Sequence, residues 1–155
     1  MRTGIGYDSH RLEAGRKLVL GGVEIESERG LAGHSDADVL THAIIDALLG
    51  AAGLGDIGQH FPDTDERWKD ADSLDLLRAV REMLRDAGHE PANIDATVAC
   101  ESPQLFPFRD EMRTRLGEAA GLGVGAVNVK FTTGEGMGFV GRGEGMAALA
   151  IATLG

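Results

Sequence analysis

The chain has 155 residues, of which 43% are hydrophobic and 26% are charged, and its formal net charge is -10. This length suits one hydrophobic core, so we expect residues 1–155 to form a single domain. So negative a charge argues against a nucleic-acid partner, which needs a basic surface, and no apolar run approaches the roughly 20 residues that cross a membrane. The start of the chain lacks the apolar stretch of a signal peptide and Cys100 is the only cysteine, which fits a cytoplasmic protein.

Hydrophobic patterns predict most of the elements in chain order. Alternation over residues 2 to 8, and two short apolar pieces within residues 17 to 26, predict strands. A helix is expected from Ser35, which would form a capping box with Asp38, to a stop at Gly53. A second helix is expected over residues 73 to 87, and a third follows Pro107 and ends near residue 120. Alternation over residues 94 to 98 and 127 to 132 predicts two further strands.

The last segment, residues 146 to 154, is apolar on every side. Periodicity alone does not distinguish a buried strand from a helix there. Its position after another strand and a glycine-rich turn favours a strand. Strands interleaved with helices indicate a layered α/β or α+β fold.

Three separated residues have the side chains of a metal site. Asp8 and His10 are two residues apart, so in a strand they project from one face, and His42 lies in the first predicted helix. A His2Asp set suits Zn²⁺ and leaves a fourth position open for substrate. Asp38 or Asp46, one helical turn away, could accept the second imidazole N–H of His42. The alternative is that Asp8 and His10 make ordinary turn hydrogen bonds and that His42 is a core histidine.

A glycine-rich segment over residues 130 to 145 is a second candidate binding region. Glycines at such density allow backbone N–H groups to approach a phosphate, and Glu135 could hold Mg²⁺ through its carboxylate. A flexible or bulged connection explains the same glycines, since the segment fits no P-loop or Rossmann motif.

Two loops complete the candidate site. Residues 56 to 65 are rich in turns and carboxylates, and long irregular segments in compact domains are often binding loops. Residues 100 to 107 form the other loop. Cys100 is interpreted there as a small buried residue rather than a nucleophile, because no base lies near it in the sequence.

Ordered motifs along the whole chain resemble the 2-C-methyl-D-erythritol 2,4-cyclodiphosphate synthase family. They are Gly6-Tyr7-Asp8-Ser9-His10, His34-Ser35-Asp36-Ala37-Asp38 through His42-Ala43, Asp46-Ala47-Leu48-Leu49-Gly50, Leu54-Gly55-Asp56-Ile57-Gly58, Phe61-Pro62-Asp63-Thr64-Asp65 and Gly141-Arg142-Gly143-Glu144-Gly145. Several such motifs in order are far more specific than any one of them.

The resemblance implies a reaction of the non-mevalonate isoprenoid pathway. The 2-phosphate of 4-diphosphocytidyl-2-C-methyl-D-erythritol 2-phosphate attacks the β-phosphorus and expels CMP, without a protein nucleophile. By resemblance, Asp8, His10 and His42 hold zinc, Glu135 holds Mg²⁺ or Mn²⁺, and His34 and Thr133 stabilise the transition state. It also implies a four-stranded mixed sheet with helices on one side, in a homotrimer with active sites between subunits.

The resemblance further implies a substrate-binding set. Ser35, Asp56, Gly58, Asp63 and Asp65 would line the erythritol side, and residues 100 to 106 with Thr132 would hold the cytidine. Arg142 and Glu144 would face the threefold axis, near a cavity that can take an isoprenoid diphosphate. The full set is Asp8, Ser9, His10, His34, Ser35, Asp56, Ile57, Gly58, Phe61, Pro62, Asp63, Thr64, Asp65, Cys100, Glu101, Ser102, Pro103, Gln104, Leu105, Phe106, Thr132, Thr133, Gly134, Glu135, Phe139 and Arg142.

The chain departs from the family pattern at three places. Gln104 stands where the family often has a lysine near the nucleotide phosphates, which predicts weaker nucleotide binding. Gly134 and Gly136 flank Glu135 in place of the more usual threonine and lysine, and Tyr7 stands where phenylalanine is common.

Two other functions fit the same residues. A phosphohydrolase would use the metals to activate water instead of aligning the substrate's own phosphate. A non-catalytic oligomeric module would use a structural metal and an axial pocket to sense isoprenoid diphosphates.

Overall fold

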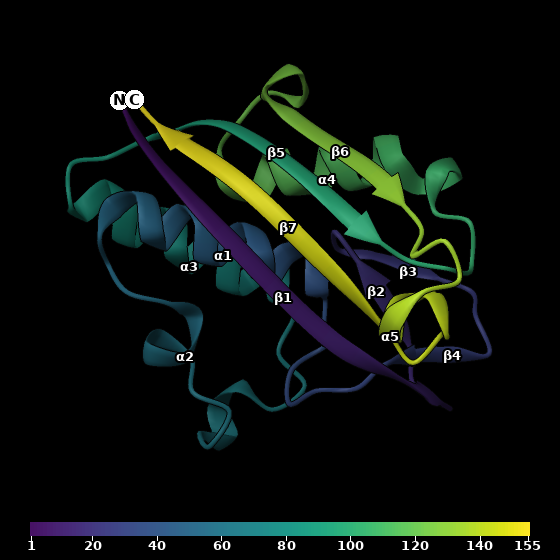
Figure 1. Ribbon diagram of the computed structural model, residues 1–155. Coiled ribbons are helices and arrows are strands. Elements are labelled where there is room, and N and C mark those ends of the chain that lie inside the picture. The colour runs from purple at the N-terminus through teal and green to yellow at the C-terminus, as the bar shows by residue number, and fades with distance from the viewer.

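The computed structural model describes residues 1–155 and is built around one mixed sheet (Figure 1). The strand order is β4-β1-β7-β5-β6, in which only β5 and β6 run parallel. The four long strands form the predicted mixed sheet, and the short β4 extends it beside the end of β1. The bounds are β1 Arg2–Ala14, β4 Arg29–Leu31, β5 Pro91–Ala99, β6 Val127–Thr132 and β7 Gly145–Leu154, and β2 Leu18–Leu20 pairs with β3 Val23–Ile25 in a separate hairpin.

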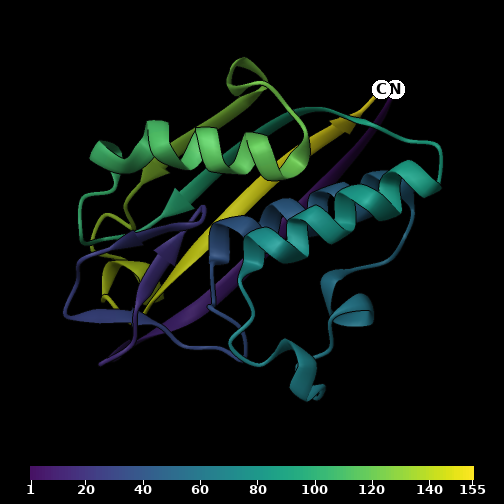
Figure 2. The same ribbon diagram turned by 180° about the vertical axis from the view of Figure 1, so that it is seen from behind.

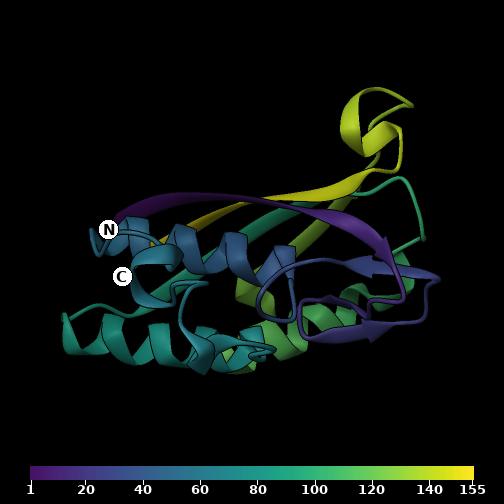
Figure 3. The same cartoon turned by 90° about the horizontal axis from the view of Figure 1, so that it is seen from below.

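The three long helices cover one face of this sheet, as Figures 2 and 3 show. The short α5 turn instead projects from the other side (Figure 3). The predicted fold class, with helices on one side, is therefore confirmed. The helices are α1 Val39–Ala52, α2 Ile57–His60, α3 Ser73–Asp86, α4 Arg109–Ala120 and α5 Gly138–Gly141, with 3-10 turns η1 Glu66–Trp68, η2 Phe106–Phe108 and η3 Val124–Ala126.

The first helix begins later than the sequence predicts. Its N-cap is Asp38, whose carboxylate accepts hydrogen bonds from the Thr41 backbone N–H and from the backbone N–H groups of Gly21 and Gly22. Ala37 has a left-handed φ of 56°, so the chain cannot be helical immediately before the cap. The predicted Ser35–Asp38 capping box is therefore wrong, while the stop at Gly53, with φ of 73°, is confirmed.

The structure also shows the conformation of the last segment and the starts of the other two predicted helices. β7 lies between β1 and β5 and is a strand, as favoured. The second helix predicted from the sequence is α3, and its N-cap is Asp72, whose carboxylate accepts the Leu74 N–H. Pro107 lies in the η2 turn rather than in the first turn of α4, which begins at Arg109.

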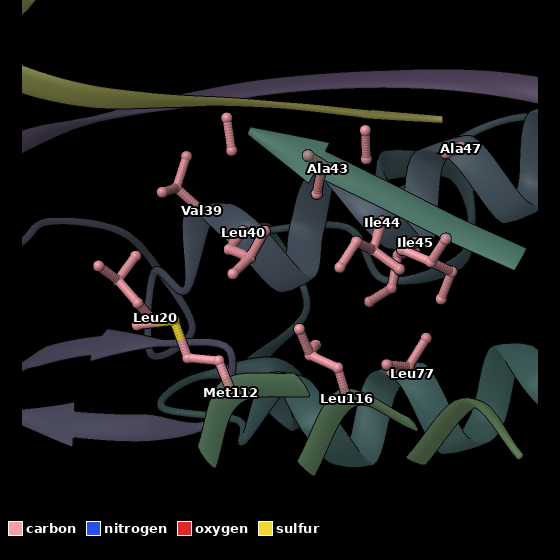
Figure 4. Close-up of a cluster of buried hydrophobic side chains, with 14 of the residues drawn as sticks. Leu20, Val39, Leu40, Ala43, Ile44, Ile45, Ala47, Leu77, Met112 and Leu116 are labelled. Atoms are coloured by element: carbon pink, nitrogen blue, oxygen red, sulfur yellow. The ribbon is translucent and has the colours of Figure 1, made fainter. Parts of the chain in front are cut away.

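Most of the core surrounds α1, which lies between the sheet and the layer of α3 and α4 (Figure 4). Its two broad apolar faces explain why nearly every side chain of this helix is buried. No helix of the structure combines the length and the apolar character that crossing a membrane requires. Side chains of this core include Leu20, Val39, Leu40, Ala43, Ile44, Ile45, Ala47, Leu77, Met112 and Leu116.

Candidate active site

Asp8, His10 and His42 meet at one point and form the group that could hold a metal ion. Asp8 Oδ2 lies 2.8 Å from His10 Nε2 and 3.1 Å from His42 Nδ1. The two ring nitrogens are 3.2 Å apart. Ligand atoms bound at about 2.0–2.1 Å around a tetrahedral zinc ion are separated by roughly 3.3 Å, so this triangle fits such an ion closely. The predicted convergence of the three residues is confirmed.

Two glycines on β1 allow α1 to come close enough for this convergence. Gly4, Gly6, Asp8 and His10 alternate along β1 on the face that α1 covers. A Cβ on Gly6 would overlap the carbonyl oxygen of Ala43, the residue after His42. Because these glycines have no side chains, α1 packs close to β1. The imidazole of His42 on α1 can therefore reach the carboxylate of Asp8 on β1.

The hydrogen bonds of His10 show that its Nε2, the ring nitrogen that faces Asp8, is available to a cation. His10 Nδ1 donates to the Ala32 carbonyl at 2.8 Å, because a carbonyl can only accept. In a neutral ring this leaves a lone pair on Nε2, which faces a carboxylate oxygen of Asp8. Two lone pairs at this distance repel unless a positive charge lies between them. The donor set therefore fits zinc, or a proton in its place.

The pKa values follow from the same contacts. Burial alone would raise the pKa of Asp8, yet hydrogen bonds and positive charge from His10 and His42 lower it to about 2. Burial alone would lower the pKa of His10, but its hydrogen bond and charge interaction with Asp8 raise it above the ordinary value. Asp8 is therefore a carboxylate at neutral pH, which is the form that binds metal.

The two aspartates predicted to orient His42 make other hydrogen bonds in the structure. The Asp38 carboxylate caps α1 and accepts the Thr41 hydroxyl at 2.7 Å. Asp46 accepts the backbone N–H of Ile57 at 2.8 Å. Neither accepts from His42, because a side chain one helical turn away cannot also reach the outer nitrogen of a ring that points across to β1. That nitrogen, Nε2, lies 2.8 Å from Ser73 Oγ.

A cavity of about 500 Å³ is lined by the metal group and by part of the predicted erythritol-side loop. His34 reaches this loop directly, since its Nε2 donates to the Asp65 carbonyl at 2.9 Å. Asp56 caps the short α2 helix beside it, and the Asp65 carboxylate is held by Arg67. The predicted residues that line the cavity are Asp8, His10, His34, Ser35, His42, Ile57, Gly58, Phe61, Pro62 and Asp63.

The predicted nucleotide residues form a second, separate cavity of about 380 Å³. They meet because the parallel strands β5 and β6 end side by side, with Ala99 opposite Thr132, and the Cys100 N–H donates to the Thr132 carbonyl. Burial raises the pKa of the Cys100 thiol to about 11, consistent with its interpretation as a small buried residue. The predicted residues on this wall are Cys100, Glu101, Pro103, Gln104, Leu105, Phe106, Thr132 and Thr133.

Glu135 lies beyond this second cavity and outside the Asp8–His10–His42 group. Its backbone is left-handed, with φ of 53°, and its N–H donates to Thr133 Oγ1 at 3.1 Å. Strained conformations of this kind cost about 1–3 kcal/mol and cluster at functional sites. Gly134, just before it, donates its N–H to the Glu101 carboxylate. Within one chain, the two predicted metal positions are therefore separate.

A third, small cavity of about 200 Å³ contains Ser9, Phe139 and Glu144. Arg142 pairs with Glu144, Nε to Oε1, at 2.8 Å. Both side chains are exposed, so this pair contributes little to folding. Within one chain, Arg142 therefore forms an exposed salt bridge with Glu144.

Three residues of the site had no predicted role. Trp68 lines the cavity at the metal group, and its Nε1–H is buried without a partner. Ser73 and Asp36 lie behind His42. Trp68 could have been found as the only tryptophan, close after the predicted binding loop. Nothing local marks Ser73, because its contact with His42 spans 31 residues.

Comparisons with known proteins identify the family of the chain. The chain is 62% identical over 154 residues to the 2-C-methyl-D-erythritol 2,4-cyclodiphosphate synthase of Salinibacter ruber, covering 99% of this chain and 98% of that protein. A solved structure of a synthase of the same name, in a form with CDP bound, superposes with a TM-score of 0.91 at 38% identity, covering 99% of this chain and 100% of the other. The bifunctional IspDF of Campylobacter jejuni gives a TM-score of 0.95 at 46% identity, covering 99% of this chain and 42% of that one. All 155 residues match the YgbB family, and the chain belongs to it.

Proposed function

We propose that this chain cyclises 4-diphosphocytidyl-2-C-methyl-D-erythritol 2-phosphate to 2-C-methyl-D-erythritol 2,4-cyclodiphosphate and releases CMP, a step of the non-mevalonate isoprenoid pathway. The observation that carries the proposal is the triangle of Asp8, His10 and His42 on the lining of a cavity. Two proteins named 2-C-methyl-D-erythritol 2,4-cyclodiphosphate synthase are 62% and 59% identical to the chain over nearly its whole length, which supports the proposal.

The proposed chemistry needs no protein nucleophile. An oxygen of the substrate's 2-phosphate forms a bond to the β-phosphorus while the bond from β-phosphorus to the bridging oxygen breaks, and that oxygen leaves with CMP. Zn²⁺ on Asp8, His10 and His42, with Mg²⁺ or Mn²⁺ on Glu135, would draw negative charge from the phosphate oxygens and align them. The protein's own contribution is orientation and the exclusion of water.

Each cavity would hold one half of the substrate. The cavity at the metal group would take the erythritol phosphate beside His34, whose Nε2–H is held by the Asp65 carbonyl. The cavity over residues 100 to 106 would take the cytidine, whose diphosphate would extend toward Thr133 and Glu135. Gln104 is neutral, so the nucleotide phosphates would depend on backbone N–H groups and metal for positive charge.

The separation of the two cavities favours a homotrimer with each site shared between subunits. The sheet face opposite the helices supports it, because apolar side chains are exposed there: Ile5 at 66%, Tyr7 at 57%, Leu149 at 45% and Ile151 at 46%. Ile5 pairs with Ile151, and Tyr7 with Leu149, across β1 and β7. Contiguous apolar patches of this kind mark interfaces.

The proposal has two further parts. An isoprenoid diphosphate would bind in an axial cavity near Arg142. The protein would be in the cytoplasm, where a free thiol such as Cys100 stays reduced.

Analysis of the products tests the proposal. Protein incubated with Zn²⁺, Mg²⁺ and the diphosphocytidyl substrate should give cyclic diphosphate and CMP in equal amounts by phosphorus NMR, and chelation should stop the reaction. Inorganic phosphate as the main product would show a phosphohydrolase instead. His42→Ala should lose turnover in a trimer that still forms, whereas a binding module with a structural metal would lose assembly.

A further inference from the structure

The Nε2 atom of His42, the ring nitrogen on the side away from Asp8, faces a hydroxyl group at the start of α3. His42 Nε2 lies 2.8 Å from Ser73 Oγ, at the start of α3, and 3.2 Å from Ser35 Oγ. Ser73 has no exposed surface and His42 is 8% exposed, so water cannot replace the serine hydroxyl there. The Ser35 contact is the longer one, and that hydroxyl also accepts the Ala37 N–H.

Asp36 fixes the direction of the hydrogen bond between these two residues. Ser73 Oγ makes a short hydrogen bond to Asp36 Oδ1, and a carboxylate can only accept. The hydroxyl proton of Ser73 is therefore directed at Asp36. Ser73 Oγ then has only lone pairs to offer His42, so the ring must donate from Nε2–H.

Asp36 is itself held in place by the backbone. Its Oδ2 accepts the Ser73 N–H at 2.9 Å, and its Oδ1 accepts the Asp38 N–H at 3.1 Å. One carboxylate thus joins the start of α3 to the turn before α1. Capping of α3 does not explain the Ser73 hydroxyl, because Asp72 is the N-cap of this helix.

We propose that Ser73 and Asp36 form a positioning relay, Asp36 to Ser73 to His42, which holds His42 with its proton on Nε2 and its Nδ1 lone pair directed at Asp8 and His10. The inference rests on the proposed metal site and adds two residues to it. Carboxylates or carbonyls that accept the second N–H of a ligating histidine fix its tautomer and raise its basicity. Here a buried serine is interposed between the carboxylate and the ring.

Zinc affinity of the whole, metal-stripped protein tests the relay. Competition with a chromophoric chelator gives the zinc dissociation constant of wild type, Ser73→Ala and Asp72→Ala. Loss of a hydrogen-bond partner behind a metal ligand typically costs about 10–100-fold in affinity, which is the loss expected for Ser73→Ala. Asp72→Ala removes the cap of the same helix without touching His42, so it should lower stability and leave zinc affinity within about twofold.

Asp36→Asn provides a second variant and a spectroscopic signature. An amide is neutral and has one acceptor atom, so it cannot accept the Ser73 hydroxyl and the Ser73 N–H at two oxygens as the carboxylate does. The relay is weakened at its end, and Ser73→Ala should then cost less in the Asp36→Asn background than in wild type. With Co²⁺ in place of zinc, the visible absorption should shift in Ser73→Ala and not in Asp72→Ala. Wild-type zinc affinity in Ser73→Ala, or an equal loss in Asp72→Ala, would overturn the relay alone. Wild-type protein that bound no zinc would overturn the metal site with it.

Discussion

The backbone of Gly6 on β1 lies directly against the carbonyl oxygen of Ala43 on α1, and a Cβ at position 6 would overlap that oxygen. Because Ala43 follows His42, the same approach sets the distance from His42 to Asp8. Fold and metal site thus depend on one close contact between strand and helix.

Gly6→Ala should therefore damage both stability and metal binding. The added methyl must push α1 away, and overpacking of this kind costs about 1–3 kcal/mol. Denaturant titration should show that loss, and zinc affinity should fall with it. Gly125→Ala is the matched control, since nothing lies within 4 Å of a Cβ there, and it should change stability by less than about 0.5 kcal/mol. Unchanged zinc affinity in a destabilised Gly6→Ala would contradict the link.

The proposed Mg²⁺ site predicts a specific defect in Glu135→Gln. Turnover should fall at least about 100-fold, which corresponds to about 2.7 kcal/mol of transition-state stabilisation, because the second charge on the diphosphate is lost. Zinc content should stay unchanged, since Glu135 lies outside the Asp8–His10–His42 group. Glu118→Gln, on the exposed side of α4, makes the same charge change and should behave as wild type. Normal turnover of Glu135→Gln at low Mg²⁺ would argue against this site.

The exposed apolar sheet face predicts the effect of one charge on assembly. Ile151→Asp would bury an unpaired carboxylate in the proposed trimer interface, so light scattering should show monomers in place of trimers. Turnover should fall with it, because in the proposed trimer each site takes residues from two chains. Val124→Asp adds the same charge at a similarly exposed apolar side chain in η3, outside this face, and should leave the trimer intact. Full activity of a monomeric Ile151→Asp would contradict shared sites.

The thiol of Cys100 should titrate far above neutral pH. Its pKa of about 11, raised by burial, leaves almost no thiolate at pH 8, so alkylation by iodoacetamide should be at least about 100-fold slower than in the unfolded chain. Because only the thiolate reacts, the rate should rise about tenfold per pH unit up to pH 11. A rate that levels off near pH 9 would show that the thiol is not shifted.

The sequence predicts those parts of the molecule that depend on local pattern. Strand alternation places Asp8 and His10 on one face, and the stripe of α1 places His42 toward them. The start of α1 is mispredicted because Ser35 and Asp38 satisfy a local capping rule, whereas Asp38 in the fold also binds the distant backbone of Gly21 and Gly22.

The partner of His42 is missed for the same physical reason. Asp38 and Asp46 are near in sequence, but the direction of the ring is set by β1, and what lies behind it is set by the docking of α3. Ser73 has no periodicity or motif of its own that marks it. Long-range packing decides which hydroxyl meets the imidazole, and only the folded chain shows it.

The most direct test of the proposed cyclisation is the reaction in oxygen-18 water. If the substrate's own 2-phosphate attacks the β-phosphorus, no solvent oxygen enters either product, and mass spectrometry should find unlabelled cyclic diphosphate and unlabelled CMP. One oxygen-18 atom in CMP, or in any phosphate product, would show that water attacks phosphorus and would contradict the account.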